Sequence, residues 1–132
     1  MSRLLALYDE VLAGRSRRGR DPRPLTVLHL VANRWWTGSA EPVTRLVLAL
    51  RARGHRALLA LAGGDRFEVK AREAGVEPLE GLRLDVKSGP LAIVGDARHL
   101  RTLVARERVD VVHTHHSHDH WLGWWGRAAR RW

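Results

Sequence analysis

The chain has 132 residues, 45% of them hydrophobic and 28% charged, a composition that indicates one globular domain and excludes a disordered chain. The absence of cysteine excludes disulfides and thiolate metal sites, and no apolar run approaches the roughly 20 residues needed to cross a bilayer. The formal net charge of +9 attracts polyanions, but all except two of the cations are arginine, which is typical of a GC-rich genome. We expect a cytoplasmic protein without a nucleic-acid partner.

The first 24 residues form a segment of their own. Residues 2–12 place apolar side chains on one helical face, and Gly14 is expected to end this helix. Residues 14–24 are basic and punctuated by glycine and proline, as a linker is. The segment either lies on anionic lipid at the inner face of a membrane or docks on the domain that spans 25–132. The docked helix is the interpretation that we favour.

From residue 25 onward, strands and helices alternate. The apolar run Leu25–Val31 predicts a strand buried on both faces. The next helix begins near an N-cap at Ser39 and ends near a C-cap at Gly54. The further predictions, in chain order, are a strand at 56–62, a helix at about 67–74, a weak strand at 76–79, a helix opened by Pro90 that restarts at Asp96, a strand at 109–113 and a helix from 121 to 131. The alternation predicts an α/β, Rossmann-like, doubly wound parallel sheet, apparently truncated at its C-terminal end.

Two loops of this sheet are candidates for a site, because ligands bind at the carboxyl ends of parallel strands. The loop after the first strand contains Trp35, Trp36, Gly38 and Ser39. The loop after the last strand contains His113, His115, His118 and Asp119, with His116 and His120 between and beyond them.

The ordered motifs resemble those of family 4 glycosyltransferases. The strand Leu25–Val31, the loop Thr-Gly-Ser-Ala-Glu that ends at Glu41 and the helix ending in Arg-Gly-His at His55 resemble the opening of that family. The segment Asp-Val-Val-His-Thr-His that ends at His115 looks like the family's Asp-Val-Val-His-x-His motif. The resemblance covers about residues 25–131. It implies the N-terminal, acceptor-side half of a two-domain GT-B enzyme that retains anomeric configuration and needs no metal or other cofactor.

The resemblance also implies roles for residues. His115 matches the histidine that the family places near the transferred sugar and its phosphate, which makes it the catalytic candidate. Gly38 and Ser39 align with a glycine pair that contacts the donor's phosphate side, although Ser39 replaces a glycine and narrows the approach. The remaining substrate-binding candidates are Trp35, Trp36, His113, His118 and Asp119. The implied partners are a nucleotide-sugar donor, held by a C-terminal domain that the sequence lacks, and a carbohydrate or lipid-linked hydroxyl acceptor.

Other interpretations stay open. Trp35 and Trp36 either stack on a sugar or cover the edge of the sheet. The histidine-rich loop has spacings that suit zinc, which would make the protein a metal-dependent hydrolase. We expect no metal, because ligands on one short loop seldom close a tetrahedron and no second cluster is evident in the sequence. The last alternative is a basic, non-catalytic module that binds anionic lipid or polysaccharide.

Overall fold

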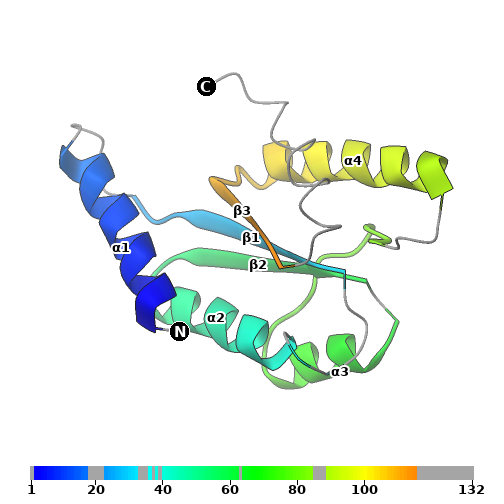
Figure 1. The fold of residues 1–132 in the computed structure, drawn as a ribbon, viewed down its shortest axis with the longest axis horizontal. Helices are drawn as coiled ribbons and strands as arrows, with labels where there is room; N and C mark the ends of the chain where they lie inside the picture. The colour runs from blue at the N-terminus through cyan, green and yellow to red at the C-terminus, as the bar shows by residue number, and fades with distance from the viewer. Residues whose placement is uncertain are drawn as a thin grey trace.

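Figure 1 shows the computed structural model, which describes residues 2–17, 23–32, 36, 38, 40–62, 64–84 and 89–115. In chain order, the elements are α1 (Ser2–Arg17), β1 (Thr26–Val31), α2 (Ala40–Ala52), β2 (Arg56–Leu61), α3 (Arg66–Glu73), α4 (Gly89–Arg106) and β3 (Val111–Thr114). None of the described helices is long and apolar enough to cross a membrane.

The sheet is parallel, in the order β2-β1-β3. The predicted strand at 76–79 is wrong as a strand: within the described residues it contributes one isolated parallel bridge, between Leu79 and Ala60 of β2. With that bridge included, the order across the sheet is 3-2-1-4 in sequence order, which is the order of the first four strands of a Rossmann fold. The predicted α/β, Rossmann-like class is therefore confirmed.

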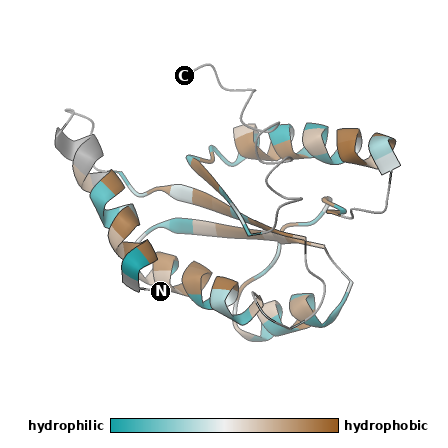
Figure 2. Cartoon of the chain, in the orientation of Figure 1, coloured by the Kyte–Doolittle hydropathy of each residue, from teal (hydrophilic) through white to brown (hydrophobic). Residues whose placement is uncertain are grey.

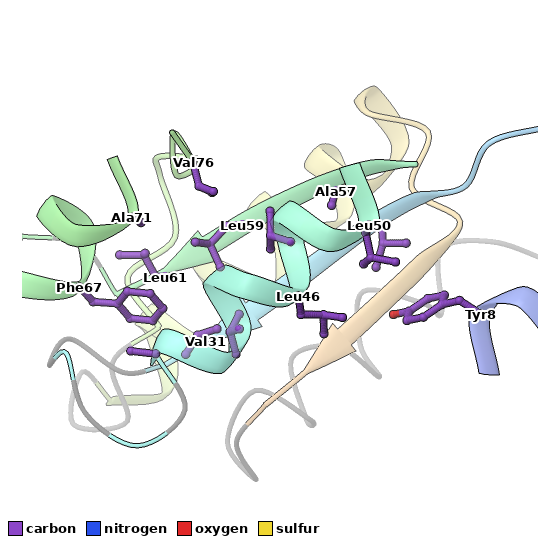
Figure 3. Close-up of a cluster of buried hydrophobic side chains, with 14 of the residues drawn as sticks. Tyr8, Val31, Leu46, Leu50, Ala57, Leu59, Leu61, Phe67, Ala71 and Val76 are labelled. Atoms are coloured by element: carbon purple, nitrogen blue, oxygen red, sulfur yellow. The ribbon is translucent and has the colours of Figure 1, made fainter. Parts of the chain in front are cut away.

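Helices cover both faces of the sheet. In Figure 1, α4 lies on one side of the strands, and α2 and α3 lie on the other. Each side has its own hydrophobic core, and hydrophobic residues recur along α2 and the central strands in Figure 2. The larger core joins the helices α1, α2 and α3 to the sheet around residues such as Leu46, Leu59 and Phe67, as Figure 3 shows for part of it. These two apolar layers make the sheet doubly wound.

Helix α1 is docked on the domain, as the favoured interpretation predicts. Leu5 and Tyr8 are buried in the larger core, and Figure 3 shows Tyr8 projecting from α1 towards β3. The predicted end at Gly14 is wrong, because the helix continues to Arg17. A glycine inside a helix costs only about 1 kcal/mol relative to alanine, and the packing of the helix outweighs that cost.

Strand β1 is the central strand of the sheet, and all six of its residues are buried. Its start is fixed by two side chains from other elements. The backbone N–H of Leu25 donates to Nδ1 of His55, and the N–H of Thr26 donates to a carboxylate oxygen of Asp110 at 2.9 Å. Gly54, with φ of +86°, makes the turn that brings His55 from the end of α2 to this position. His55 of the Arg-Gly-His motif and Asp110 of the Asp-Val-Val-His motif thus hold the start of β1 in place beside β2 and β3.

Helix α4 differs from the prediction at its middle. Pro90 lies in the first turn, as expected, but the helix runs without interruption through Asp96. Asp96 does not cap a restarted helix; its carboxylate accepts hydrogen bonds from the backbone N–H groups of Arg83 and Leu84, at 3.0 and 2.9 Å. A residue type that favours N-caps is used here to hold the preceding loop.

Candidate functional site

The carboxyl ends of β1 and β3 lie side by side at the switch point of the sheet. The chain leaves β1 towards α2 on one face and reaches β3 from α4 on the other, so the connections diverge between these neighbouring strands. In open α/β sheets, ligands bind in the crevice that such divergence creates. This edge is therefore the place in the fold where a site is expected.

Three histidines meet at this edge. The parallel register places His29 of β1 directly opposite His113 of β3, and His115 follows two residues later on the same side. The rings of His113 and His115 are stacked, with centroids 4.2 Å apart, and the His29 ring lies 5.1 and 5.4 Å from them. We call these three side chains the histidine triad. Its members come from two strands, and the structure brings together the predicted residues His113 and His115.

His29 is the buried member of the triad. Its side chain has no exposed surface, and its Nδ1 atom lies 3.1 Å from Nε2 of His115. Among the described residues, its other nitrogen, Nε2, is buried without a hydrogen-bond partner. Burial, and then the charges of His113 and His115, lower the pKa of His29 to about 3. His29 is therefore neutral at physiological pH, and its Nδ1 atom can accept a hydrogen bond from the Nε2–H tautomer of His115.

His113 lies between the triad and helix α1. It is half-buried, and its Nδ1 atom lies 3.4 Å from the hydroxyl oxygen of Tyr8. Burial lowers the pKa of His113, and burial raises the pKa of Tyr8 to about 12, so both groups are held in their neutral forms. The neutral hydroxyl and the neutral imidazole form one hydrogen bond, in which the donor depends on the tautomer of His113, and this bond orients the His113 ring. Helix α1 thereby reaches the site, a contact that the sequence did not indicate.

Comparisons with known proteins identify the family and support the fold. The model of Glycosyltransferase Family 4 matches residues 36–132. The chain belongs to glycosyltransferase family 4. The fold is similar to that in the crystal structure of a glycosyltransferase from Rickettsia africae ESF-5, with a TM-score of 0.68, 19% sequence identity and 82% of this chain covered. The chain spans 28% of the length of that protein. A comparison with curated proteins found no match.

In this family 4 chain, the loop after β1 is described in part. Gly38 is exposed and has φ of +53°, a left-handed conformation that glycine adopts without strain, and apart from its chain neighbours no described residue comes within 4 Å of where its Cβ would be. Trp36 is half-buried and packs edge-on against Phe67, with ring centroids 5.7 Å apart. That contact agrees with the alternative in which the tryptophan covers the edge of the sheet. A substrate-binding role for Trp36 or Gly38 stays a prediction.

The other predicted site residues lie outside the described part of the chain. They are Trp35, Ser39, His118 and Asp119, together with His116 and His120. Their roles, and the catalytic role of His115, stay predictions.

Sequence reasoning missed His29, although a signal for it was present. An ionisable side chain in the middle of an otherwise apolar strand needs a polar partner, because burying it alone is costly. The other histidines stand in the fourth strand of the alternating pattern, and in a Rossmann fold the fourth strand is the neighbour of the first. Together, these two facts could have placed His29 beside His113 and His115.

Proposed function

We propose that the chain is the acceptor-side domain of a retaining GT-B enzyme that transfers a sugar from a nucleoside-diphosphate sugar to a hydroxyl acceptor. Membership of family 4 supports this function, as does the position of the histidine triad at the switch point. The nucleotide-sugar donor would be bound by a second domain, since the chain spans 28% of the Rickettsia africae glycosyltransferase. The acceptor would lie over the carboxyl ends of β1 and β3.

The observation that carries the proposal is the hydrogen bond between His29 and His115. A sugar transfer places growing negative charge on the departing diphosphate, and a pre-oriented donor or cation next to that charge lowers the barrier. His29 is fully buried and neutral, so it holds the His115 ring in one orientation without competing for the substrate. His115 is half-buried and lies at the end of β3, where its ring can face a ligand.

Gly38 supports a phosphate-binding role for the loop that leads into α2. Backbone N–H groups at a helix amino terminus attract anions, and a glycine lets a ligand approach the backbone closely. Gly38 is exposed two residues before α2 begins at Ala40, and among the described residues other than its chain neighbours none comes within 4 Å of its Cβ position. We assign this loop to the phosphate side of the donor, and the histidine triad to the transferred sugar and the phosphate that departs from it.

Binding of acceptors to the isolated chain tests the proposal. The histidine side chains would be observed by ¹⁵N NMR in the presence of a chelator, while monosaccharides, disaccharides and octyl glycosides are added. We expect at least one glycoside to shift the signals of His113 and His115 and to leave His99, an exposed residue of α4, unchanged. A response to anionic vesicles alone, with none to any glycoside, would favour the basic binding module instead.

A further inference from the structure

We infer that the histidine triad is a binding site for a divalent transition-metal ion, with zinc as the best fit. One ring nitrogen from each of His29, His113 and His115 can be chosen so that all three lie within 4.8 Å of one another. Among the described residues, this group contains three imidazoles and no carboxylate. A set of three neutral nitrogen ligands is one that zinc, cobalt, nickel and copper accept and that magnesium and calcium do not favour.

The spacing of the nitrogens is close to what a tetrahedral ion requires. Zinc–nitrogen bonds of about 2.0–2.1 Å at tetrahedral angles separate two ligand nitrogens by about 3.4 Å. Nδ1 of His29 and Nε2 of His115 are 3.1 Å apart, so this pair needs to open by only a few tenths of an ångström. The His113 ring is already stacked on that of His115, and one of its nitrogens lies within 4.8 Å of a nitrogen of each of the other two histidines.

The surroundings of the triad resemble those of a built metal site in one respect. Metal-binding histidines need a second partner on the other ring nitrogen to fix their orientation. The Tyr8 hydroxyl lies 3.4 Å from Nδ1 of His113, which leaves Nε2 of that ring for a metal ion.

Two adjacent strands supply the ligands. The sequence-based objection, that ligands on one short loop seldom close a tetrahedron, therefore does not apply to this triad. His113 and His115 alone, two residues apart on one strand, cannot complete a metal site. His29 joins them from β1 because the parallel register sets it opposite His113. Three protein ligands leave the fourth tetrahedral position for water or an anionic oxygen, as in zinc sites that bind substrates.

This inference goes beyond the proposed function. A metal ion on Nε2 of His115 replaces the hydrogen bond between that nitrogen and Nδ1 of His29, so the metal-bound triad and the hydrogen-bonded pair are two alternative states of the site. The metal test therefore contains no substrate, and the glycoside titration contains a chelator. Each result stands whatever the other shows.

The experiment is zinc titration of the purified chain by calorimetry after dialysis against a chelator, with cobalt absorption as a second readout. We expect one ion per chain, bound in the micromolar range or more tightly, and a tetrahedral cobalt spectrum. His29→Gln should weaken binding by more than about tenfold, since even the loss of an outer partner commonly costs that much. His99→Gln is the matched control and should bind as the unaltered chain does, because His99 lies on α4 away from the triad.

The His29 variant separates the triad from simple capture by the histidine-rich segment after β3. An ion held by residues 113–120 alone would bind the His29→Gln variant unchanged, and that result would overturn the inference. If His29→Gln does not fold, His29→Leu replaces it with the same expected loss. Failure of zinc to bind the folded chain, or equal affinity in the triad variant and the control, would also contradict the site.

Discussion

Nδ1 of His29 lies 3.1 Å from Nε2 of His115, although 86 residues separate the two histidines in the chain. The contact follows from the parallel pairing of β1 with β3. At the amino ends of these strands, the N–H of Thr26 donates to the carboxylate of Asp110, and the N–H of Asp110 donates to the carbonyl oxygen of Thr26, which fixes the register. The buried, neutral imidazole of His29 thus holds the imidazole of His115 in position at the carboxyl edge of the sheet. We regard this pair as the structural basis of the proposed site.

The first prediction concerns acid stability, measured by urea unfolding of the metal-free chain between pH 3 and 8. The pKa of His29 is about 3 in the folded chain and about 6.5 in the unfolded chain. Between these values the unfolded chain binds more protons, so the contribution of His29 is fully present above pH 6.5 and is lost as the pH falls towards 3. The expected slope is up to about 1.4 kcal/mol per pH unit.

The His29→Gln variant should lose this part of the pH dependence, and His99→Gln should keep it. Parallel pH profiles for the original chain and the His29 variant would show that His29 does not titrate in that window.

Asp110 gives the second prediction. Its carboxylate accepts hydrogen bonds from the backbone N–H of Thr26 and from the guanidinium of Arg23, and its side chain is 7% exposed. Asp110→Ala leaves the buried N–H of Thr26 unpaired, so we expect a loss of about 2–3 kcal/mol in the free energy of unfolding, measured with urea. Asp9→Ala, which removes an exposed ion pair with Arg53, should change stability little. Equal effects of the two substitutions would contradict the role of Asp110 at the start of β1.

Asp96 gives the third prediction. The carboxylate is buried and accepts from two backbone N–H groups, including that of Leu84, whose φ is +48°. A side chain in this left-handed region is held there by its surroundings. Asp96→Ala should therefore destabilise the chain by about 2–3 kcal/mol and speed hydrogen exchange at Arg83 and Leu84. Unchanged exchange at these two amides would show that the loop does not depend on Asp96.

The fold could be predicted well where the pattern is local. The apolar run at Leu25–Val31 and the spacing of Val43, Val47 and Leu50 in the next helix are enough to indicate a buried strand and an amphipathic helix, and both are present. The prediction failed where a distant contact decides the outcome. Residues 76–79 have strand-like side chains, but in the described structure only Leu79 pairs with β2.

The site was predicted in part, for the same physical reason. His113 and His115 could be placed at a strand end because their positions follow from the strand that precedes them. The partnership with His29 depends on which residue of β1 faces His113, and a shift of one residue in register would turn His29 to the other face of the sheet. The contact of Tyr8 with His113 depends on how α1 docks, which the sequence of the helix does not specify.

The isolated chain should transfer no sugar, which is the fourth prediction. In the proposed enzyme, the nucleotide sugar binds to a second domain and the active site forms between the two. Incubation of purified 1–132 with radiolabelled UDP-glucose or GDP-mannose and the glycosides above should give no labelled product. Measurable turnover would show that these residues contain a complete donor site.

The most direct test of the proposed function is the rate of transfer after His115→Ala in a protein that joins this chain to a family 4 donor domain. If His115 stabilises charge on the departing phosphate, kcat should fall by about 10²–10³-fold, the scale for one lost charge-stabilising donor. KM should change less, because the interaction strengthens in the transition state. His29→Gln should lower kcat by a smaller factor, and His99→Gln should not change it. Full activity of His115→Ala would contradict the catalytic role proposed for this histidine.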